Sequence, residues 1–385
     1  MIIMPPALPA FSPNFIMYSL GLATYIEPMF LQVSEEPESS LGLTAIVPAY
    51  NEERSIARTL ESLIAQTNGL EGIIVVDDGS VDGTSEIAGS FEGVRLIRNP
   101  RHIGKAESIN RVLDLVDTDL VMIVDADTVL DESYADKAVK KFIKEDVVAA
   151  SGFVIPSMES VNSSIRRARV VEDFYSQTTL KRGQNSINGI FVISGCCAVF
   201  RTSVLKRSRI PTGTVTEDLD LTWFLEREGH RTALIDAYAH TLEPRGLNEY
   251  INQIKRWYTG FFQCLVKHGV KVFSSKALAL TLTSILIECL IFTLFWASAI
   301  GLVVLVPWLS GELSFLRWFV LTMILVDLAT VCFPAILKAR DAGFSNDFLS
   351  GLPIYYSLRI VNTFVWWATL IEWLFGWGAT WKTTH

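Results

Sequence analysis

Four short apolar runs, separated by helical patterns, constrain the fold of this chain more than any other feature. The runs are residues 43–48 (LTAIVP), 72–76 (GIIVV), 94–98 (VRLIR) and 120–124 (LVMIV). Between them, residues 56–64 and 105–115 space their apolar side chains as amphipathic helices do. Strands that alternate with helices predict a parallel sheet with both faces covered. The sequence therefore predicts an α/β fold for this part of the chain.

Acidic residues stand at the ends of two of these strands. Asp78 follows the second strand, and Asp125 and Asp127 follow the fourth. Ligands bind beyond the carboxyl ends of the strands in such sheets. There, Asp78 can accept a hydrogen bond from a base or a ribose. On an extended segment Asp125 and Asp127 would point the same way, which suits Mg²⁺ or Mn²⁺ held jointly with diphosphate oxygens.

Several other functions are disfavoured by what the sequence contains. It has no Gly-x-Gly-x-x-Gly and no Walker loop, which argues against a dinucleotide enzyme and a P-loop NTPase. A net charge of −8 provides no overall basic field, so we expect no nucleic-acid partner. The basic cluster of Arg166, Arg167 and Arg169 is interpreted as a solvated helix face rather than a contact for lipid or diphosphate.

Charged residues are concentrated in the middle of the chain. Residues 1–40 contain no Lys or Arg, and residues 276–385 contain six of the 33. We therefore expect three regions. Residues 1–40 are an apolar membrane anchor or a single span, residues 41–275 a soluble domain that ends in interfacial helices, and residues 276–385 a membrane domain with about three helices.

The predicted spans are residues 289–311, 318–337 and 360–377, of which the last can instead lie in the membrane interface. Lys338 and Arg340 lie between the last two spans, which places that loop on the cytoplasmic side. The domain at 41–275 is then cytoplasmic as well. We expect an integral protein of the plasma (inner) membrane, in contact with membrane lipid.

Seven motifs follow one another across residues 43–275. They are VPAYNE (47–52), VDDGS (76–80), NPRHIGKA (99–106), DAD (125–127), SGCCAVFR (194–201), TED (216–218) and QIKRW (253–257). Their order resembles that of the family 2 glycosyltransferases, and the last motif resembles the membrane-integrated branch. That branch includes cellulose, chitin, hyaluronan and poly-N-acetylglucosamine synthases. The resemblance implies a GT-A fold for residues 41–275, followed by transmembrane helices.

The resemblance also implies where a UDP-sugar donor binds. Pro48, Tyr50 and Glu52 lie in the motif that runs along the uridine, and Asp78 lies in the uracil-binding motif. Lys105 lies in the segment that approaches the base and the diphosphate. Asp125 and Asp127 form the motif that binds Mg²⁺ or Mn²⁺, with Asp125 also beside the donor.

The remaining motifs imply the acceptor side of the reaction. Asp218 is the expected base, with Glu217 beside it, and we expect only one of the two to face the site because neighbouring helical side chains diverge by about 100°. Gln253, Arg256 and Trp257 belong to the last motif. Arg256 and Lys105 can stabilise the departing UDP, and Trp257 offers a flat face to a sugar ring or base. Residues 194–201 resemble the acceptor segment.

The predicted function is therefore an inverting, metal-dependent membrane glycosyltransferase that extends a β-linked polysaccharide or oligosaccharide. One alternative is a non-processive enzyme that glycosylates a membrane lipid, as ceramide glucosyltransferase does, so the acceptor is a carbohydrate or a lipid. The other alternative is a transporter or scaffold with a degenerate transferase domain, against which the intact acidic motifs argue.

Overall fold

The computed structural model describes residues 41–67, 69–158, 163–287, 289–290, 322, 325, 328 and 332–376. Within this part of the chain, one mixed sheet has the strand order β3-β2-β1-β4-β7-β6-β8-β5. The strands are β1 (Leu43–Ala49), β2 (Gly72–Asp77), β3 (Val94–Arg98), β4 (Leu120–Val124), β5 (Val129–Leu130), β6 (Ala149–Pro156), β7 (Cys197–Arg201) and β8 (Thr232–Thr241).

The predicted parallel sheet is confirmed for the first four strands. β1 pairs in parallel with β2 and β4, and β2 with β3. Their boundaries agree with the apolar runs to within one residue, because buried strands must be apolar on both faces. The other half of the sheet is mixed, since β7 runs antiparallel to both β4 and β6. Burial makes strands apolar whatever their direction, so the sequence pattern did not reveal this reversal.

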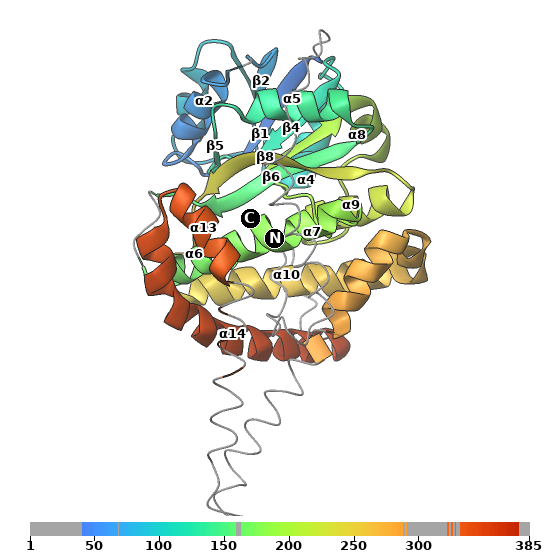
Figure 1. The fold of residues 1–385 in the computed structure, drawn as a ribbon. Helices are drawn as coiled ribbons and strands as arrows, with labels where there is room; N and C mark the ends of the chain where they lie inside the picture. Colours follow the sequence, from blue (N-terminus) through green and yellow to red (C-terminus); the bar gives the residue numbers. More distant parts are fainter. Residues whose placement is uncertain are drawn as a thin grey trace, which may run out of the picture.

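Helices cover both faces of the sheet and form further layers beneath it (Figure 1). The helices around the sheet itself are α2 (Ile56–Ile64), α3 (Thr84–Gly89), α4 (Lys105–Leu113), α5 (Tyr134–Lys144) and α8 (Thr202–Ser208). The layers below contain α6 (Ser164–Tyr175), the π-helical turn η3 (Ser176–Leu180), α7 (Lys181–Ser186), α9 (Glu217–Arg227), α10 (Leu247–His268), the 3₁₀ turn η4 (Gly269–Ser274), α13 (Phe333–Asp341) and α14 (Ser345–Leu374).

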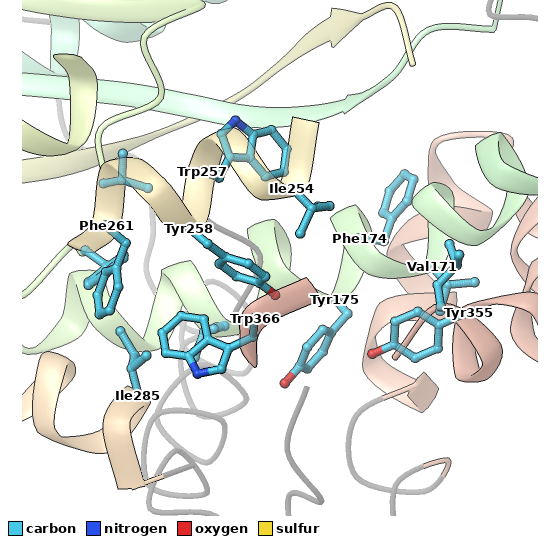
Figure 2. Close-up of a cluster of buried hydrophobic side chains, with 14 of the residues drawn as sticks. Val171, Phe174, Tyr175, Ile254, Trp257, Tyr258, Phe261, Ile285, Tyr355 and Trp366 are labelled. Carbon is cyan, nitrogen blue, oxygen red and sulfur yellow. The ribbon is translucent and has the colours of Figure 1, made fainter. Parts of the chain in front are cut away.

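An aromatic core joins α6, α10 and α14. Trp366 of α14 lies with its ring centroid 4.9 Å from those of Tyr258 and Phe262 on α10. Figure 2 shows that Tyr258 and Trp257 leave α10 on opposite sides, Tyr258 toward Trp366 and Trp257 away from it. An ion pair between Arg166 of α6 and Asp347 of α14, 2.8 Å apart, adds a polar tie. α10 therefore lies between α14 and the side of the molecule that Trp257 faces.

The predicted membrane segments are only partly covered by the description. Residues 1–40 and most of residues 289–311 and 318–337 lie outside the described residues. Residues 360–374 form the second half of α14, which packs on α6 and α10. None of the helices in the described ranges combines the length and the apolar character needed to cross a bilayer. The transmembrane helices and the domain boundaries stay predictions.

Candidate active site

A cleft of about 800 Å³ opens at the carboxyl ends of β1, β2 and β4, between these strands and helices α4, α9 and α10. All twelve residues singled out from the sequence line this cleft. They are Pro48, Tyr50, Glu52, Asp78, Lys105, Asp125, Asp127, Glu217, Asp218, Gln253, Arg256 and Trp257. The structure thus brings together residues that are more than 200 positions apart in the chain.

The carboxylate of Asp78 is hydrogen-bonded to the loop that follows β3. Its carboxylate accepts hydrogen bonds from the Asn99 side chain at 2.8 Å and from the backbone N–H groups of Ile103 and Gly104 at 2.9 and 2.7 Å. Nδ1 of His102 lies 2.8 Å from the same group. Burial raises the pKa of Asp78, but these hydrogen bonds outweigh it and hold the pKa below its ordinary value. Asp78 therefore helps to shape the wall of the cleft, which it also lines, and its contact with a base or a ribose stays a prediction.

His102 forms the exposed part of that wall and was missed in the sequence. Its ring lies on Tyr50, with 4.2 Å between the ring centroids and 31° between the ring planes. Both side chains line the cleft. The signal that could have found His102 is its position two residues before Gly104. The backbone of Gly104 has a φ of 97°, which turns the loop back over Asp78.

The predicted extended segment at Asp125–Asp127 is a turn instead, closed by a hydrogen bond from the Thr128 N–H to the Asp125 carbonyl oxygen at 3.0 Å. Both carboxylates still line the cleft, but they differ in their partners. Nζ of Lys105 lies 2.5 Å from Asp125 and 3.3 Å from Glu217, and this first residue of α4 therefore bridges two acidic segments. Burial lowers the pKa of Lys105, but the neighbouring carboxylates outweigh it and raise the pKa above its ordinary value.

Negative charge is in excess around Asp127. Burial, followed by the charges of Asp125 and Glu52, raises its pKa to about 7. Burial also raises the pKa of Glu52, although the hydrogen bond from the Ser55 hydroxyl opposes this shift. The single ammonium group of Lys105 does not balance these carboxylates, so a cation bound here would be stabilised.

The same carboxylates fit a divalent metal only in part. In the described segments, no cluster of three or more His, Cys, Asp or Glu side chains is placed to hold a metal ion. Asp125 and Asp127 supply two carboxylates, which is the usual protein share of an Mg²⁺ or Mn²⁺ site that diphosphate oxygens complete. The donor set therefore fits a metal that arrives with a nucleotide diphosphate.

Glu217 and Asp218 occupy the first turn of α9, where the helix dipole favours acidic side chains. Asp218 accepts hydrogen bonds from the Leu219 N–H at 2.8 Å and from the Gly195 N–H at 3.3 Å. Our expectation that only one of the two carboxylates would face the site is wrong, since both line the cleft. The first turn points its open end into the cleft, so side chains 100° apart can both reach it.

α10 provides the opposite wall through Gln253, Arg256 and Trp257. Trp257 is only 7% exposed, and the guanidinium of Arg169 lies 5.5 Å from the centre of its ring. Arg256 makes no ion pair with any described residue, so its charge is available to the cleft. Oε1 of Gln253 is buried and has no hydrogen-bond partner among the described residues.

The interpretation of residues 166–169 as a solvated helix face is wrong. Arg166 and Arg169 are each only 3% exposed. Arg169 instead binds acidic residues at the far end of the cleft, a part of the site that sequence reasoning missed. The available signal was the spacing of Arg169, Glu172 and Asp173, which places them on one face of a helix.

Comparison with known proteins agrees with this site. Residues 44–209 match the model of the family "Glycosyl transferase family 2". Residues 44–209 are therefore similar to the domain of that family, which supports a glycosyltransferase. Among its curated relatives is a poly-beta-1,6-N-acetyl-D-glucosamine synthase of Staphylococcus aureus, 27% identical over 243 residues that make up 61% of this chain. The corresponding synthase of Staphylococcus epidermidis is 26% identical over 256 residues, or 65% of this chain. The chain spans 58% and 62% of the length of these two relatives.

A solved structure shows the fold. A mannosyltransferase from Pyrobaculum calidifontis, determined in complex with GDP-Man and Mn²⁺, aligns with a TM-score of 0.59 at 19% identity. The alignment covers 89% of this chain and 99% of that one. The predicted GT-A-like α/β fold is therefore confirmed.

Proposed function

We propose that this chain is an inverting, metal-dependent glycosyltransferase that uses a UDP-sugar to extend a β-linked polysaccharide or oligosaccharide. The observation that supports this most is the convergence of Asp218, Lys105, Arg256 and the Asp125–Asp127 pair on one cleft. The likeness to poly-beta-1,6-N-acetyl-D-glucosamine synthases makes UDP-N-acetylglucosamine the first donor to test.

The chemistry assigns one task to each group. Asp218 accepts the proton of the acceptor hydroxyl as its oxygen bonds to the anomeric carbon of the donor. The bond from that carbon to the diphosphate oxygen breaks on the opposite face, which inverts the configuration, and UDP leaves. Lys105 and Arg256 stabilise the charge that develops on the diphosphate. Asp125 and Asp127 would hold Mg²⁺ or Mn²⁺, which neutralises the same charge when it is bound.

The nucleotide is assigned to the half of the cleft formed by β1, β2 and the loop after β3. Tyr50 and His102 form a flat aromatic wall there, suited to a planar base. The solved mannosyltransferase carries GDP-Man and Mn²⁺, which supports a nucleotide-diphosphate sugar and a divalent metal in this fold but leaves the base open. The trial of donors described below therefore includes both bases.

A lipid acceptor is the second candidate, and the surface of α14 favours it. Phe364, Trp367, Ile371 and Leu374 are between 39% and 64% exposed and recur at helical spacing on one face. We propose that this face lies on membrane lipid, with the cleft on the cytoplasmic side, as the charge of Lys338 and Arg340 indicates. A membrane position brings a lipid acceptor close to the chain.

The test is release of the nucleoside diphosphate, UDP or GDP, by the detergent-purified chain, with Mn²⁺ or Mg²⁺ and with EDTA as a control. UDP-N-acetylglucosamine, UDP-glucose, UDP-glucuronate and GDP-mannose are compared as donors. We expect release from one UDP-sugar, loss of that release in EDTA, and loss in Asp218→Asn with UDP affinity retained. Product size then decides the acceptor, since a single-sugar product that partitions into organic solvent would refute polymer extension. No release from any donor would refute the transferase proposal.

A further inference from the structure

The far end of the cleft contains a buried charge cluster that no step above uses. Arg169 of α6 donates to Glu243, which follows β8, at 2.7 Å and to Glu172 at 2.9 Å. Its third nitrogen lies 3.3 Å from Asp173 Oδ1. One guanidinium therefore serves three carboxylates, all less than a tenth exposed.

Asp173 differs from the other two carboxylates. It is 1% exposed, yet neither of its oxygens has a hydrogen-bond partner of suitable geometry among the described residues. Glu243 and Glu172 take the well-aligned N–H groups of Arg169. Burial, opposed by Arg169, raises the pKa of Asp173 well above its ordinary value. Among the described residues its partner is Arg169, at 3.3 Å and without hydrogen-bond geometry; a buried carboxyl group so poorly satisfied costs free energy, and its retention calls for an explanation.

The cleft supplies that explanation, because Asp173 lines it together with Arg169, Glu243, Gln253 and Trp257. Gln253 is the second side chain in this part of the cleft with a buried oxygen, Oε1, that has no hydrogen-bond partner among the described residues. Two unpaired acceptors beside an aromatic face match the hydroxyl groups and the apolar face of a pyranose ring. Glu172, by contrast, does not line the cleft.

We propose that Asp173 binds a hydroxyl group of the acceptor glycan, at a subsite formed by Asp173, Gln253 and Trp257. This inference rests on the proposed function and goes beyond it by assigning the acceptor to the β6–β8 half of the sheet. α6 follows β6 and Glu243 follows β8, whereas Tyr50 follows β1 and the Asp125–Asp127 pair follows β4. The acceptor thus enters from the side opposite to the nucleotide base.

The charged and titratable groups around Asp173 come from several elements. Arg169 and Glu172 lie on its own helix, and Glu243 lies on the segment after β8. Tyr250 of α10 lies close enough to interact with the charges of Arg169 and Glu172, and Arg359 of α14 interacts with Glu172. A variant at Asp173 removes its own contact with Arg169 and leaves the pairs of Arg169 with Glu172 and Glu243 intact, whereas a variant at Glu172 removes one of these two hydrogen-bonded pairs.

The experiment compares Asp173→Ala, Asp173→Asn and the matched control Glu172→Gln in the full chain. The acceptor is a β-1,6-linked N-acetylglucosamine pentasaccharide and the donor is UDP-N-acetylglucosamine. Asp173→Ala should raise the KM for the pentasaccharide about tenfold or more and change the donor KM about twofold at most. Asp173→Asn keeps a donor and an acceptor and should stay within about threefold of the wild type. Glu172→Gln should lower the melting temperature without changing either KM.

Calorimetric titration with the pentasaccharide alone separates this proposal from the previous one. If the unaltered chain releases no UDP from any donor, the proposed function fails, and pentasaccharide binding still decides the subsite. Absent binding, or equal binding by Asp173→Ala, overturns the subsite. An equal rise in donor and acceptor KM overturns it too. If Asp173→Asn is as impaired as Asp173→Ala, the ligand requires a charge, and a hydroxyl group is the wrong ligand.

Discussion

Gly260, in the middle of α10, allows the closest approach between this helix and the segment that leads into α9. A Cβ atom at Gly260 would lie 2.1 Å from Oγ1, 2.4 Å from Cγ2 and 2.7 Å from Cβ of Thr216. Rotation of the Thr216 side chain moves the first two atoms but not its Cβ. Gly260→Ala must therefore push α10 away from Thr216, which directly precedes Glu217 and Asp218.

The magnitude follows from two opposing effects. Overpacking a buried contact costs about 1–3 kcal/mol, and three contacts under 3.0 Å place this one at the upper end. Alanine gains about 1 kcal/mol over glycine inside a helix. We expect a net loss of about 2 kcal/mol in the free energy of unfolding, or a melting temperature about 2–3 °C lower for a chain of this length. Because Asp218 moves with Thr216, kcat for UDP release should also fall, by about tenfold.

The assays are thermal unfolding and UDP release per folded molecule. Gly189→Ala is the matched control, because its Cβ would meet the backbone oxygen of Ala277 at 2.9 Å and neither residue lines the cleft. It should lose stability and keep its kcat. Adding Thr216→Ala to Gly260→Ala should recover part of both losses, since it removes the two nearest atoms. Unchanged stability and kcat in Gly260→Ala would refute the close approach, and equal loss of kcat in the control would refute its link to Asp218.

Two further predictions concern pH and the membrane. Asp127 must lose its proton to bind a metal, so Mn²⁺-dependent donor affinity should weaken as the pH falls below about 7, where its folded pKa lies; a flat profile between pH 6 and 8 would contradict this. The folded pKa of Asp127 exceeds its ordinary value of 3.8, so between these two pH values the unfolded chain binds fewer protons than the folded one. The metal-free protein therefore loses stability as the pH rises from 3.8 to about 7. Asp127→Asn should remove that loss in thermal unfolding. Phe364→Asp with Trp367→Asp should reduce flotation of the chain with anionic vesicles, beside Val81→Asp as a control at a more exposed apolar residue of the sheet domain; equal reduction by the control would refute lipid contact through α14.

The first half of the sheet could be predicted because burial on both faces leaves a continuous apolar run, and a turn or acidic residue marks its end. The cleft could be predicted for the same reason, since parallel strands align their carboxyl ends at one edge. The antiparallel direction of β7 could not be predicted, because an apolar run looks the same in a parallel and in an antiparallel strand. The hydrogen bonds between Asp78 and the loop after β3 could not be predicted, because Ile103 and Gly104 contribute backbone N–H groups, which any sequence has.

The acceptor end of the cleft was missed for a different reason. Arg169, Asp173 and Glu243 are charged, and charged residues are seldom buried unless they are paired. The pairing of Arg169 with Glu243 joins residues 74 positions apart, so no local pattern indicates it. Long-range ion pairs of this kind are visible only once the fold is known.

α10 forms a single layer between the cleft and α14, and this layer sets the distance from the cleft to the outer face of α14. Trp257 leaves this helix toward the cleft, and Tyr258 leaves it toward α14, whose outer face presents Phe364 and Trp367. Packed helices lie about 8–10 Å apart, so the ring of Trp257 stands roughly 20 Å from that outer face. If α14 rests on lipid, a lipid-linked sugar would have to rise by this distance to reach the base, whereas the end of a growing glycan already lies at that level. The combined thickness of α10 and α14 would thus select acceptors by their length.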